Sequence, residues 1–216
     1  MLVLAFDTAT PAVTVALHDG TRALAQESSV DVRRHGELLA PAIGRVLAAA
    51  GAKPADLTSI AVGTGPGPYT GLRVGLVTAL AMGSALGIAV DGICTLDVIA
   101  AGAVGQAGGR EFIVATDARR REVYWARYSA AGECLSGPEV SVPALVPGGY
   151  PVAGQGALLY QELASRPIGQ SWPGAADLAG ISVRKLSRGQ LPGAPEPQYL
   201  RRPDAAEPGR PKRVTR

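Results

Sequence analysis

The chain opens with LVLAFDTATPAVTVALHDGTRALAQES (residues 2–28), in which apolar runs alternate with short polar turns. The first run stops at Asp7, and a second run follows the turn that Pro11 closes. The pair Asp19-Gly20 then reverses the chain, because both residues tolerate the positive φ that tight hairpin turns require. The sequence therefore predicts a meander of three strands, at residues 2–6, 12–17 and 22–28.

Helical and strand patterns alternate after the meander. Apolar residues at helical spacing predict a helix over residues 34–50 that ends at Gly51. Pro41 either kinks this helix or marks its true first turn. The apolar residues 57–62 predict a buried strand, and a glycine-rich loop (GTGPGPY, 63–69) follows it. The remaining predicted elements are a helix at 70–86, a strand at 88–93 and a helix at 95–103 with Thr95 as its N-cap.

A second copy of the opening design follows a glycine-rich break at residues 105–110. Predicted strands at 111–116 and 123–128 flank Asp117, as the first two strands flank Asp7. The parallel indicates an internal duplication, although so few matched positions leave a chance likeness open. Two lobes that each begin with a strand, an Asp and a hairpin resemble the actin, hexokinase and Hsp70 superfamily. We expect lobes at residues 1–104 and 105–202, and a tail at 203–216.

Asp7, Gly65 and Gly67 are the candidate residues for a nucleotide site. That superfamily places a carboxylate like Asp7 near a metal and phosphates, but Ala9 stands where its kinases usually have glycine. The alternative is a structural Asp that turns the chain through an Asx-type hydrogen bond. Glycines ahead of a helix resemble a phosphate cradle, yet the spacing is neither Walker A nor the dinucleotide motif. A weak nucleotide contact and a rigid structural loop both stay open.

A stripe of small residues runs along the helix predicted at 70–86. Gly71, Gly75, Ala79 and Gly83 recur at intervals of four and lie on one helical face. Glycine inside a helix costs about 1 kcal/mol relative to alanine, so the stripe indicates a close packing contact that offsets this cost. The spacing does not decide between a contact inside the chain and one with another subunit.

Metal and nucleophilic chemistry lack a recognisable motif. His35 is the only histidine near a predicted helix, and Leu39 stands where a second metal ligand would be needed. We interpret His35 as a surface residue at the start of the helix. Neither of the chain's two histidines lies in a pattern that would activate a Ser, Cys or Lys nucleophile. The sequence therefore predicts no catalytic residue, no metal site and no cofactor.

Composition predicts a folded chain in the cytoplasm. Apolar residues make up 47% of the 216 positions, which excludes disorder of the whole chain. The first residues lack a basic segment, so no signal peptide is expected. Cys94 and Cys134 fit neither a metal spacing nor a dense disulfide pattern, which favours a reducing compartment. The uncharged residues 74–90 are too short and too weakly hydrophobic to be expected to cross a membrane.

The net charge of +3 hides an uneven distribution. Residues 201–216 hold six basic and two acidic residues, a balance of +4 that leaves −1 for the remainder. Such a tail is typical of a disordered, solubilising end, and a contact with phosphate is the alternative.

Four motifs in order resemble the bacterial TsaB (YeaZ) family. They are LAFDTAT (4–10), GPGPYTGLRVG (65–75), TDAR (116–119) with EVYWA (122–126), and EPQYLR (196–201). The likeness covers residues 2–202, apart from a poorly matched stretch at 147–181. It implies an α/β protein of the actin-like ATPase (ASKHA, ribonuclease H-like) fold, with two lobes whose mixed sheets are flanked by helices.

The resemblance also implies a role and partners. Members of the family take part in making threonylcarbamoyladenosine in tRNA as non-catalytic subunits. They pair with the paralogue TsaD, which holds the metal, nucleotide and transfer site, and the ATPase TsaE joins them. The rivals are a glycoprotease-like metallopeptidase and an actin-fold small-molecule kinase acting alone.

The two helices predicted at 34–50 and 70–86 correspond to those that meet the paralogue in this family, and an isolated subunit can use the same surface to form a homodimer. We therefore expect a subunit interface at nine residues of these helices: His35, Leu39, Ile43, Val46, Gly71, Leu72, Gly75, Ala79 and Gly83.

Overall fold

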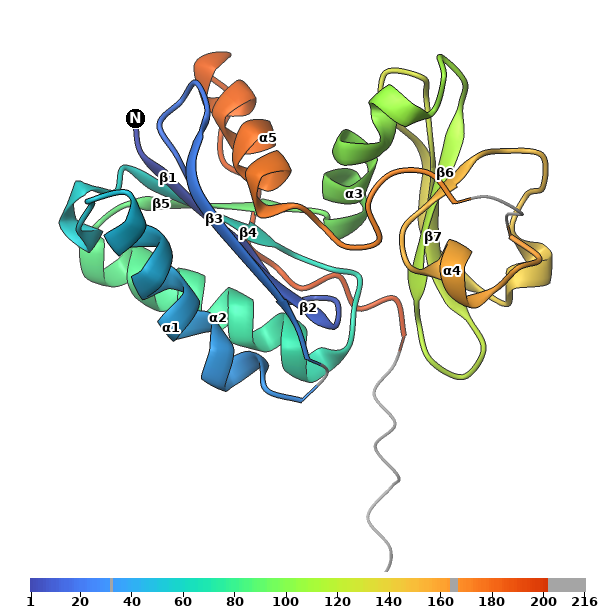
Figure 1. Ribbon diagram of the computed structural model, residues 1–216, viewed down its shortest axis with the longest axis horizontal. Coiled ribbons are helices and arrows are strands. Elements are labelled where there is room, and N and C mark those ends of the chain that lie inside the picture. Colours follow the sequence, from blue (N-terminus) through green and yellow to red (C-terminus); the bar gives the residue numbers. More distant parts are fainter. Residues whose placement is uncertain (32, 164–166, 202–216) are drawn as a thin grey trace, which may run out of the picture.

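The predicted meander forms one edge of a five-stranded sheet. The computed structural model describes residues 1–31, 33–163 and 167–201. In the first sheet the strand order is β3-β2-β1-β4-β5, with β1 to β3 antiparallel and β4 and β5 parallel to β1 (Figure 1). The strands are β1 (Val3–Asp7), β2 (Ala12–His18), β3 (Ala23–Val30), β4 (Ser59–Gly63) and β5 (Ala89–Ile93).

Helices cover both faces of this sheet. α1 (His35–Ala49) and α2 (Tyr69–Leu86) lie on one face, and α5 (Ala175–Ser187) lies on the other (Figure 1). Along β1, Leu4 and Phe6 point into the core under α1 and α2, while Val3 and Ala5 point into the core under α5. Because both faces are covered, the central strands are apolar at nearly every position.

A smaller sheet of four strands repeats the order of the first, as β8-β7-β6-β9. β6 pairs antiparallel with β7 and parallel with β9, as β1 does with β2 and β4. This shared topology supports the predicted duplication. The strands are β6 (Phe112–Asp117), β7 (Val123–Tyr128), β8 (Cys134–Ser141) and β9 (Val152–Ala153), accompanied by α3 (Thr95–Ala103) and α4 (Gly156–Leu159).

The predicted α/β architecture, with two mixed sheets flanked by helices, is confirmed. Most element bounds agree within one or two residues; the strand predicted at 57–62, for example, begins at Ser59. Pro41 lies inside α1, so it does not mark the first turn of that helix. One correction concerns α3, whose N-cap is Cys94 rather than Thr95. Three short 3-10 turns lie at Pro54–Asp56, Val104–Gln106 and Pro143–Leu145.

The end of the described chain returns to the first sheet. Leu178, Ala179 and Val183 of α5 pack against the first sheet, although they fall in the range expected for the second lobe. The segment 190–201 follows them: the N–H of Gly92 in β5 donates to the carbonyl of Gly193. The boundary at residue 105 stays a prediction, and the tail at 203–216 lies outside the described residues.

The uncharged stretch at residues 74–90, considered above as a membrane span, overlaps most of α2, which begins earlier, at Tyr69, and ends at Leu86. By length and composition alone this 18-residue helix could cross a membrane, a test that core helices of soluble proteins also pass. Its small-residue face is buried within the chain, so internal packing accounts for the apolar residues on that face.

Candidate functional site: a closed glycine loop beside an open helical face

Asp7 lies at the end of β1 and is fully buried. One carboxylate oxygen, Oδ1, accepts a hydrogen bond from the N–H of Ala9 at 2.7 Å, which is the predicted Asx-type turn. The other oxygen, Oδ2, accepts the hydroxyl of Thr95 at 2.7 Å. Both oxygens of Asp7 therefore accept hydrogen bonds from within the chain. Asp117 in β6 repeats the turn, because its Oδ1 accepts the N–H of Arg119 at 2.9 Å.

Burial raises the pKa of Asp7 from 3.8 to about 6. Desolvation penalises the charged carboxylate most, while the hydrogen bonds from Thr95 and Ala9 and the charge of His35 favour it and limit the rise. The carboxyl group is thus half protonated in mildly acidic solution, and it faces protein groups on both sides.

The glycine loop closes over Asp7 instead of cradling a ligand. A Cβ on Gly63 would lie 1.9 Å from Asp7 Oδ2, and a Cβ on Gly67 would lie 2.0 Å from the carbonyl oxygen of Ala9. Gly65 has a φ of 90° and exchanges two hydrogen bonds with Thr95. The glycines permit these internal contacts. These contacts favour the structural alternative, and the nucleotide contact of Asp7, Gly65 and Gly67 stays a prediction.

The small-residue stripe of α2 also packs inside the chain. A Cβ on Gly71 would meet the carbonyl oxygen of Thr8 at 2.5 Å, and one on Gly75 would meet Thr8 Oγ1 at the same distance. A Cβ on Gly83 would meet Val90 of β5 at 2.5 Å. The Thr8 hydroxyl is itself held by the helix, since it donates to the Gly71 carbonyl and accepts the Gly75 N–H. The close neighbours of the stripe are the chain's own Thr8 turn and β5.

The predicted interface residues therefore lie on the inner side of the two helices. His35 is only 9% exposed, and its Nε2 lies 2.8 Å from the carbonyl oxygen of Thr10, so it is not a surface residue. The assignment of the interface to these side chains stays a prediction, and their burial within the chain leaves little of their surface for a partner. All nine are buried: His35, Leu39, Ile43, Val46, Gly71, Leu72, Gly75, Ala79 and Gly83.

The outer side of α2 is apolar as well. Val77 is 63% exposed and Leu80 is 47% exposed, and they lie three residues apart on the helix. Near the start of the helix the rings of Tyr69 and Tyr199 pack at 4.5 Å between centroids. Arg73 lies over both rings and donates to the Tyr199 hydroxyl. A helix that is apolar on two sides indicates two packing partners, a signal that was present in the sequence.

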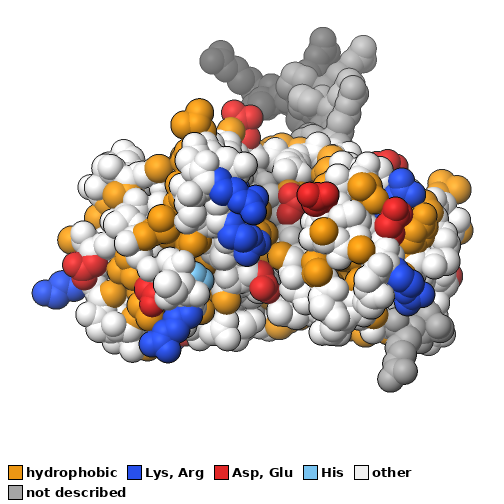
Figure 2. Space-filling view, turned by 90° about the horizontal axis from the view of Figure 1, so that it is seen from above, with side chains coloured by type: hydrophobic (Ala, Val, Ile, Leu, Met, Phe, Trp, Pro, Cys, Tyr) orange, Lys and Arg blue, Asp and Glu red, His pale blue; other side chains and the backbone are white. Residues whose placement is uncertain are grey.

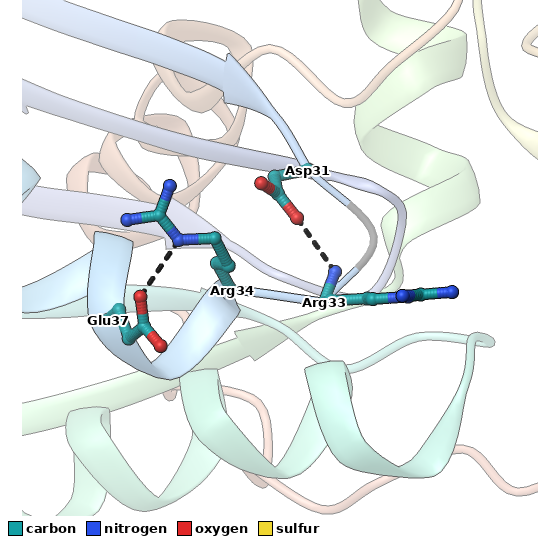
Figure 3. A network of polar contacts seen from close by, with 4 residues as sticks. All are labelled: Asp31, Arg33, Arg34 and Glu37. Carbon is teal, nitrogen blue, oxygen red and sulfur yellow. Dashed lines mark hydrogen bonds and ion pairs between the residues drawn. The ribbon is translucent and has the colours of Figure 1, made fainter.

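A cavity of about 310 Å³ lies where the first turns of α1 and α2 approach the β6–β7 hairpin. Arg33 and Arg119 line it, and Arg119 begins three consecutive arginines with positive φ. Figure 3 shows Arg33 extending away from the neighbouring Arg34–Glu37 ion pair, while its N–H donates to Asp31. Helix N-termini and guanidinium groups both favour anions. The sequence analysis missed this cavity because its residues come from four separate segments.

Among the described residues no group of three or more His, Cys, Asp or Glu side chains could hold a metal ion. On the face seen over α5, positive, negative and apolar side chains are interspersed (Figure 2). The outer side of α2 and the Arg33–Arg119 cavity are therefore the main candidate contact surfaces near the glycine loop.

Comparison with known proteins gives consistent matches. The family model described as TsaD, tRNA N6-adenosine threonylcarbamoyltransferase, matches residues 26–165. An uncharacterized protein of Mycobacterium tuberculosis is 44% identical over 206 residues, which cover 94% of this chain and 93% of that protein. The Escherichia coli tRNA threonylcarbamoyladenosine biosynthesis protein TsaB is 39% identical over 131 residues, covering 59% of this chain and 55% of that protein.

A solved structure, YeaZ from Pseudomonas aeruginosa, extends the likeness to nearly the whole chain. It is 30% identical and superposes with a TM-score of 0.79 over 92% of this chain and 99% of that one. Together with the motifs at both lobes, this match and the TsaB relatives show that the chain belongs to the TsaB (YeaZ) family.

Proposed function

We propose that this chain is a non-catalytic partner subunit in the biosynthesis of N6-threonylcarbamoyladenosine in tRNA. It pairs with a TsaD paralogue that carries the transfer site, the ATPase TsaE joins the pair, and tRNA is bound through the assembly. The chain works in the cytoplasm, and in isolation it can form a homodimer. The names of relatives from Escherichia coli and Bacillus subtilis support the pathway.

The closed glycine loop is the observation that carries the non-catalytic role. A phosphate group beside Gly67 would need the space that the Ala9 carbonyl already fills. Both oxygens of Asp7, the carboxylate expected near a metal, accept hydrogen bonds from the chain. A fold whose nucleotide site is occupied by its own backbone is suited to supporting another subunit.

The outer side of α2 supports the choice of docking surface. Exposed Val77 and Leu80 supply apolar area, and the Tyr69–Arg73–Tyr199 cluster adds the residue types that are enriched at protein interfaces. The proposed contact therefore keeps the predicted helix α2 but uses its outer side chains together with Tyr199.

The two rival functions receive no specific support from the described residues. A metallopeptidase would need a ligand cluster, and a small-molecule kinase would need room for phosphates beside the glycine loop. The described residues include no such ligand cluster. In the same part of the chain, the space beside Gly63 and Gly67 is filled by Asp7 and the Ala9 carbonyl.

Val77→Arg tests the docking surface. It introduces a charge on the outer side of α2 without touching the core, so the melting temperature should stay within about 2 °C while partner affinity falls by about tenfold or more. Leu158→Arg is the matched control, because Leu158 is similarly exposed on α4. Both variants are assayed by pull-down with the TsaD paralogue of the same organism. Equal binding by both would refute the surface.

Deleting the gene tests the pathway independently of the surface. Nucleoside mass spectrometry of tRNA from the deletion strain should show loss of threonylcarbamoyladenosine, restored by the wild-type chain. Restoration by Asp7→Asn would support the non-catalytic role, since that change removes the carboxylate that lies against Gly63 of the glycine loop. Undiminished modification in the deletion strain would refute the proposed function.

A further inference from the structure

A cavity of about 580 Å³ lies at the outer edge of the first sheet, between β2 and β3 on one side and the start of α5 on the other. The segment 170–173, which leads into α5, forms the rest of its wall. α5 covers the face of the sheet opposite to α1 and α2 (Figure 1). Small-molecule sites typically have volumes of about 300 to 1,000 Å³. The cavity is therefore large enough for a small ligand, and it lies away from the outer side of α2.

Polar side chains form the floor of the cavity. Val15 packs in the core under α1 and α2, and side chains alternate between the two faces of a strand, so Thr14 points to the α5 side. Directly paired residues share a face, and Thr14 pairs with Ser28. In the same way Ala16, two residues along β2, pairs with Gln26. The sheet therefore presents two hydroxyls and an amide to the cavity.

The Thr14 hydroxyl has no hydrogen-bond partner among the described residues, although Thr14 is only 4% exposed. A buried hydroxyl without a partner costs free energy that a hydrogen bond would offset. Most such groups are hydrogen-bonded in native proteins, so each exception needs an explanation. A polar ligand in the cavity would supply the missing partner.

The side-chain charge that faces the cavity is negative. Asp177 lines it, and its described lining includes no Lys, Arg or His side chain. Glu27 borders it as well, but the Glu27 carboxylate accepts two hydrogen bonds from Arg45 on the α1 side of the sheet. Asp177 Oδ2 accepts a hydrogen bond from Gln170 at 3.4 Å, and no described cation lies within ion-pair distance of Asp177. Asp177 is therefore a carboxylate with room for a cationic partner.

The electrostatics of the α5 start favour a cation over an anion. Desolvation raises the pKa of Asp177, while the charge of Arg184, farther along α5, and the Gln170 hydrogen bond lower it by less. A cation beside Asp177 would offset this desolvation. The N–H groups at a helix start carry about half a positive charge in total, less than the full charge of Asp177 in the same turn.

Trp172 supplies the remaining feature of the wall. The face of an indole ring attracts ammonium groups, and its apolar surface packs against a hydrocarbon chain. The cavity therefore combines a carboxylate, neutral oxygen acceptors and an aromatic ring. Together these groups suit an organic cation with a short apolar chain.

We propose that this cavity binds a small aliphatic diamine in its dicationic form. One ammonium group pairs with Asp177, the hydrocarbon chain lies against Trp172, and the other ammonium group donates to the hydroxyls of Thr14 and Ser28. An ammonium group offers three donors and no acceptor, which matches this set of oxygens. The site is separate from the docking surface on α2, so its test does not depend on the proposed function.

Isothermal titration calorimetry of the full chain tests the charge of the ligand. Putrescine, butanediol and succinate each contain four carbon atoms but end in ammonium, hydroxyl and carboxylate groups. All are measured at one ionic strength, because salt screens weak attraction to exposed charges. Putrescine should bind at least about tenfold more tightly than butanediol, and succinate should bind most weakly. No binding of putrescine, or binding of butanediol or succinate as tight as that of putrescine, would overturn the proposal.

Asp177→Asn tests the position of the ligand. It removes the charge and keeps the shape of the side chain, so putrescine should bind about tenfold more weakly or worse. Glu139→Gln is the matched control, because Glu139 is an exposed carboxylate in β8 of the other sheet, and it should leave the affinity unchanged. Unchanged affinity in Asp177→Asn, or an equal loss in Glu139→Gln, would place the ligand elsewhere and contradict the proposal.

Thr14→Val keeps the site testable even where Asp177→Asn does not fold. Valine has nearly the shape of threonine and lacks the unpartnered hydroxyl, so the unliganded variant should melt at the temperature of the wild type or above it. Its affinity for putrescine should fall by about threefold or more. Thermal unfolding and calorimetry measure the two effects. A Thr14→Val chain that binds putrescine as tightly as the wild type would refute the proposed site.

Discussion

Both carboxylate oxygens of Asp7 accept hydrogen bonds from the chain itself. The neighbouring glycines permit this arrangement. The Asp7 carboxylate lies so close to Gly63, and the Ala9 carbonyl so close to Gly67, that a Cβ atom at either glycine would overlap it. Asp7 and these glycines therefore form a buried turn. Two substitutions test how much this turn contributes to the free energy of unfolding.

Asp7→Asn should remove a pH dependence of stability. The folded-state pKa of Asp7, about 6, lies above the unfolded value of 3.8, so the protonated form stabilises the fold. That stability is fully present below about pH 4 and is lost as the pH rises through about 6. Relative to the variant, the wild type should lose about 2 to 3 kcal/mol between pH 4 and pH 8. Urea unfolding across this range measures the difference, and parallel curves would contradict the buried environment.

Gly63→Ala should destabilise the fold by about 1 to 3 kcal/mol, because its methyl group would overlap the Asp7 carboxylate. Gly44→Ala is the control: Gly44 lies in α1, where an added Cβ meets nothing within 4 Å. Removing a helical glycine there should raise stability by about 0.5 to 1 kcal/mol. Thermal unfolding distinguishes the two, and a neutral Gly63→Ala would show that the loop is looser than the structure indicates.

At the scale of the element, α2 carries two different apolar sides. The glycine side packs on the Thr8 turn and on β5, and the outer side presents Val77 and Leu80 to solvent. The repeat of small residues predicts close packing but carries no information on which neighbour supplies it. That neighbour is the chain's own Thr8 turn together with β5.

Gly75→Leu should therefore damage folding rather than partner binding alone. A branched side chain at Gly75 would displace Thr8, whose hydroxyl bridges two residues of the helix, at an expected cost of about 3 kcal/mol or more. Ala81→Leu adds the same side chain to the exposed side of α2 and should change stability by less than about 0.5 kcal/mol. A stable Gly75→Leu chain that fails to bind its partner would support the predicted assignment of the stripe to the interface.

Across the whole molecule, the segment 190–201 joins the two sheets. Gln198 donates its backbone N–H to Thr64 in the glycine loop, and the Tyr69 hydroxyl donates to the carbonyl of Arg201. The Arg201 guanidinium reaches the β6–β7 hairpin, where it donates to the Ala118 carbonyl and pairs with Glu122. One residue thus connects the start of α2 to the β6–β7 hairpin.

Arg201→Ala should loosen the second lobe more than the first. Loss of the guanidinium leaves the half-buried Glu122 without this partner, and we expect a loss of about 1 to 3 kcal/mol. Hydrogen exchange should accelerate in β6 and β7 and remain slow in β1. Arg188→Ala, at the exposed end of α5, is the control. Uniform acceleration in both sheets would argue against a link between lobes.

Local sequence determined the elements whose signals are local. Asp-Gly at a hairpin, helical spacing of apolar residues and an Asp that bonds two residues ahead act over a few positions, so the meander, α1, α2 and the Asp7 turn were all predictable. The strands β8 and β9 were not, because they are held by pairing with β7 and β6 rather than by a pattern of their own.

Only the tertiary structure decided which side of each helix stays exposed and which groups fill the glycine loop. Gly67 meets Ala9 and Gly83 meets Val90, and no spacing along the chain reports those distances. The sequence determined that something must approach the stripe closely, because helical glycine is unfavourable without such a contact. The fold determined that the chain's own Thr8 turn and β5 do so, because packing is a contact between segments far apart in sequence and depends on where the backbone brings them together.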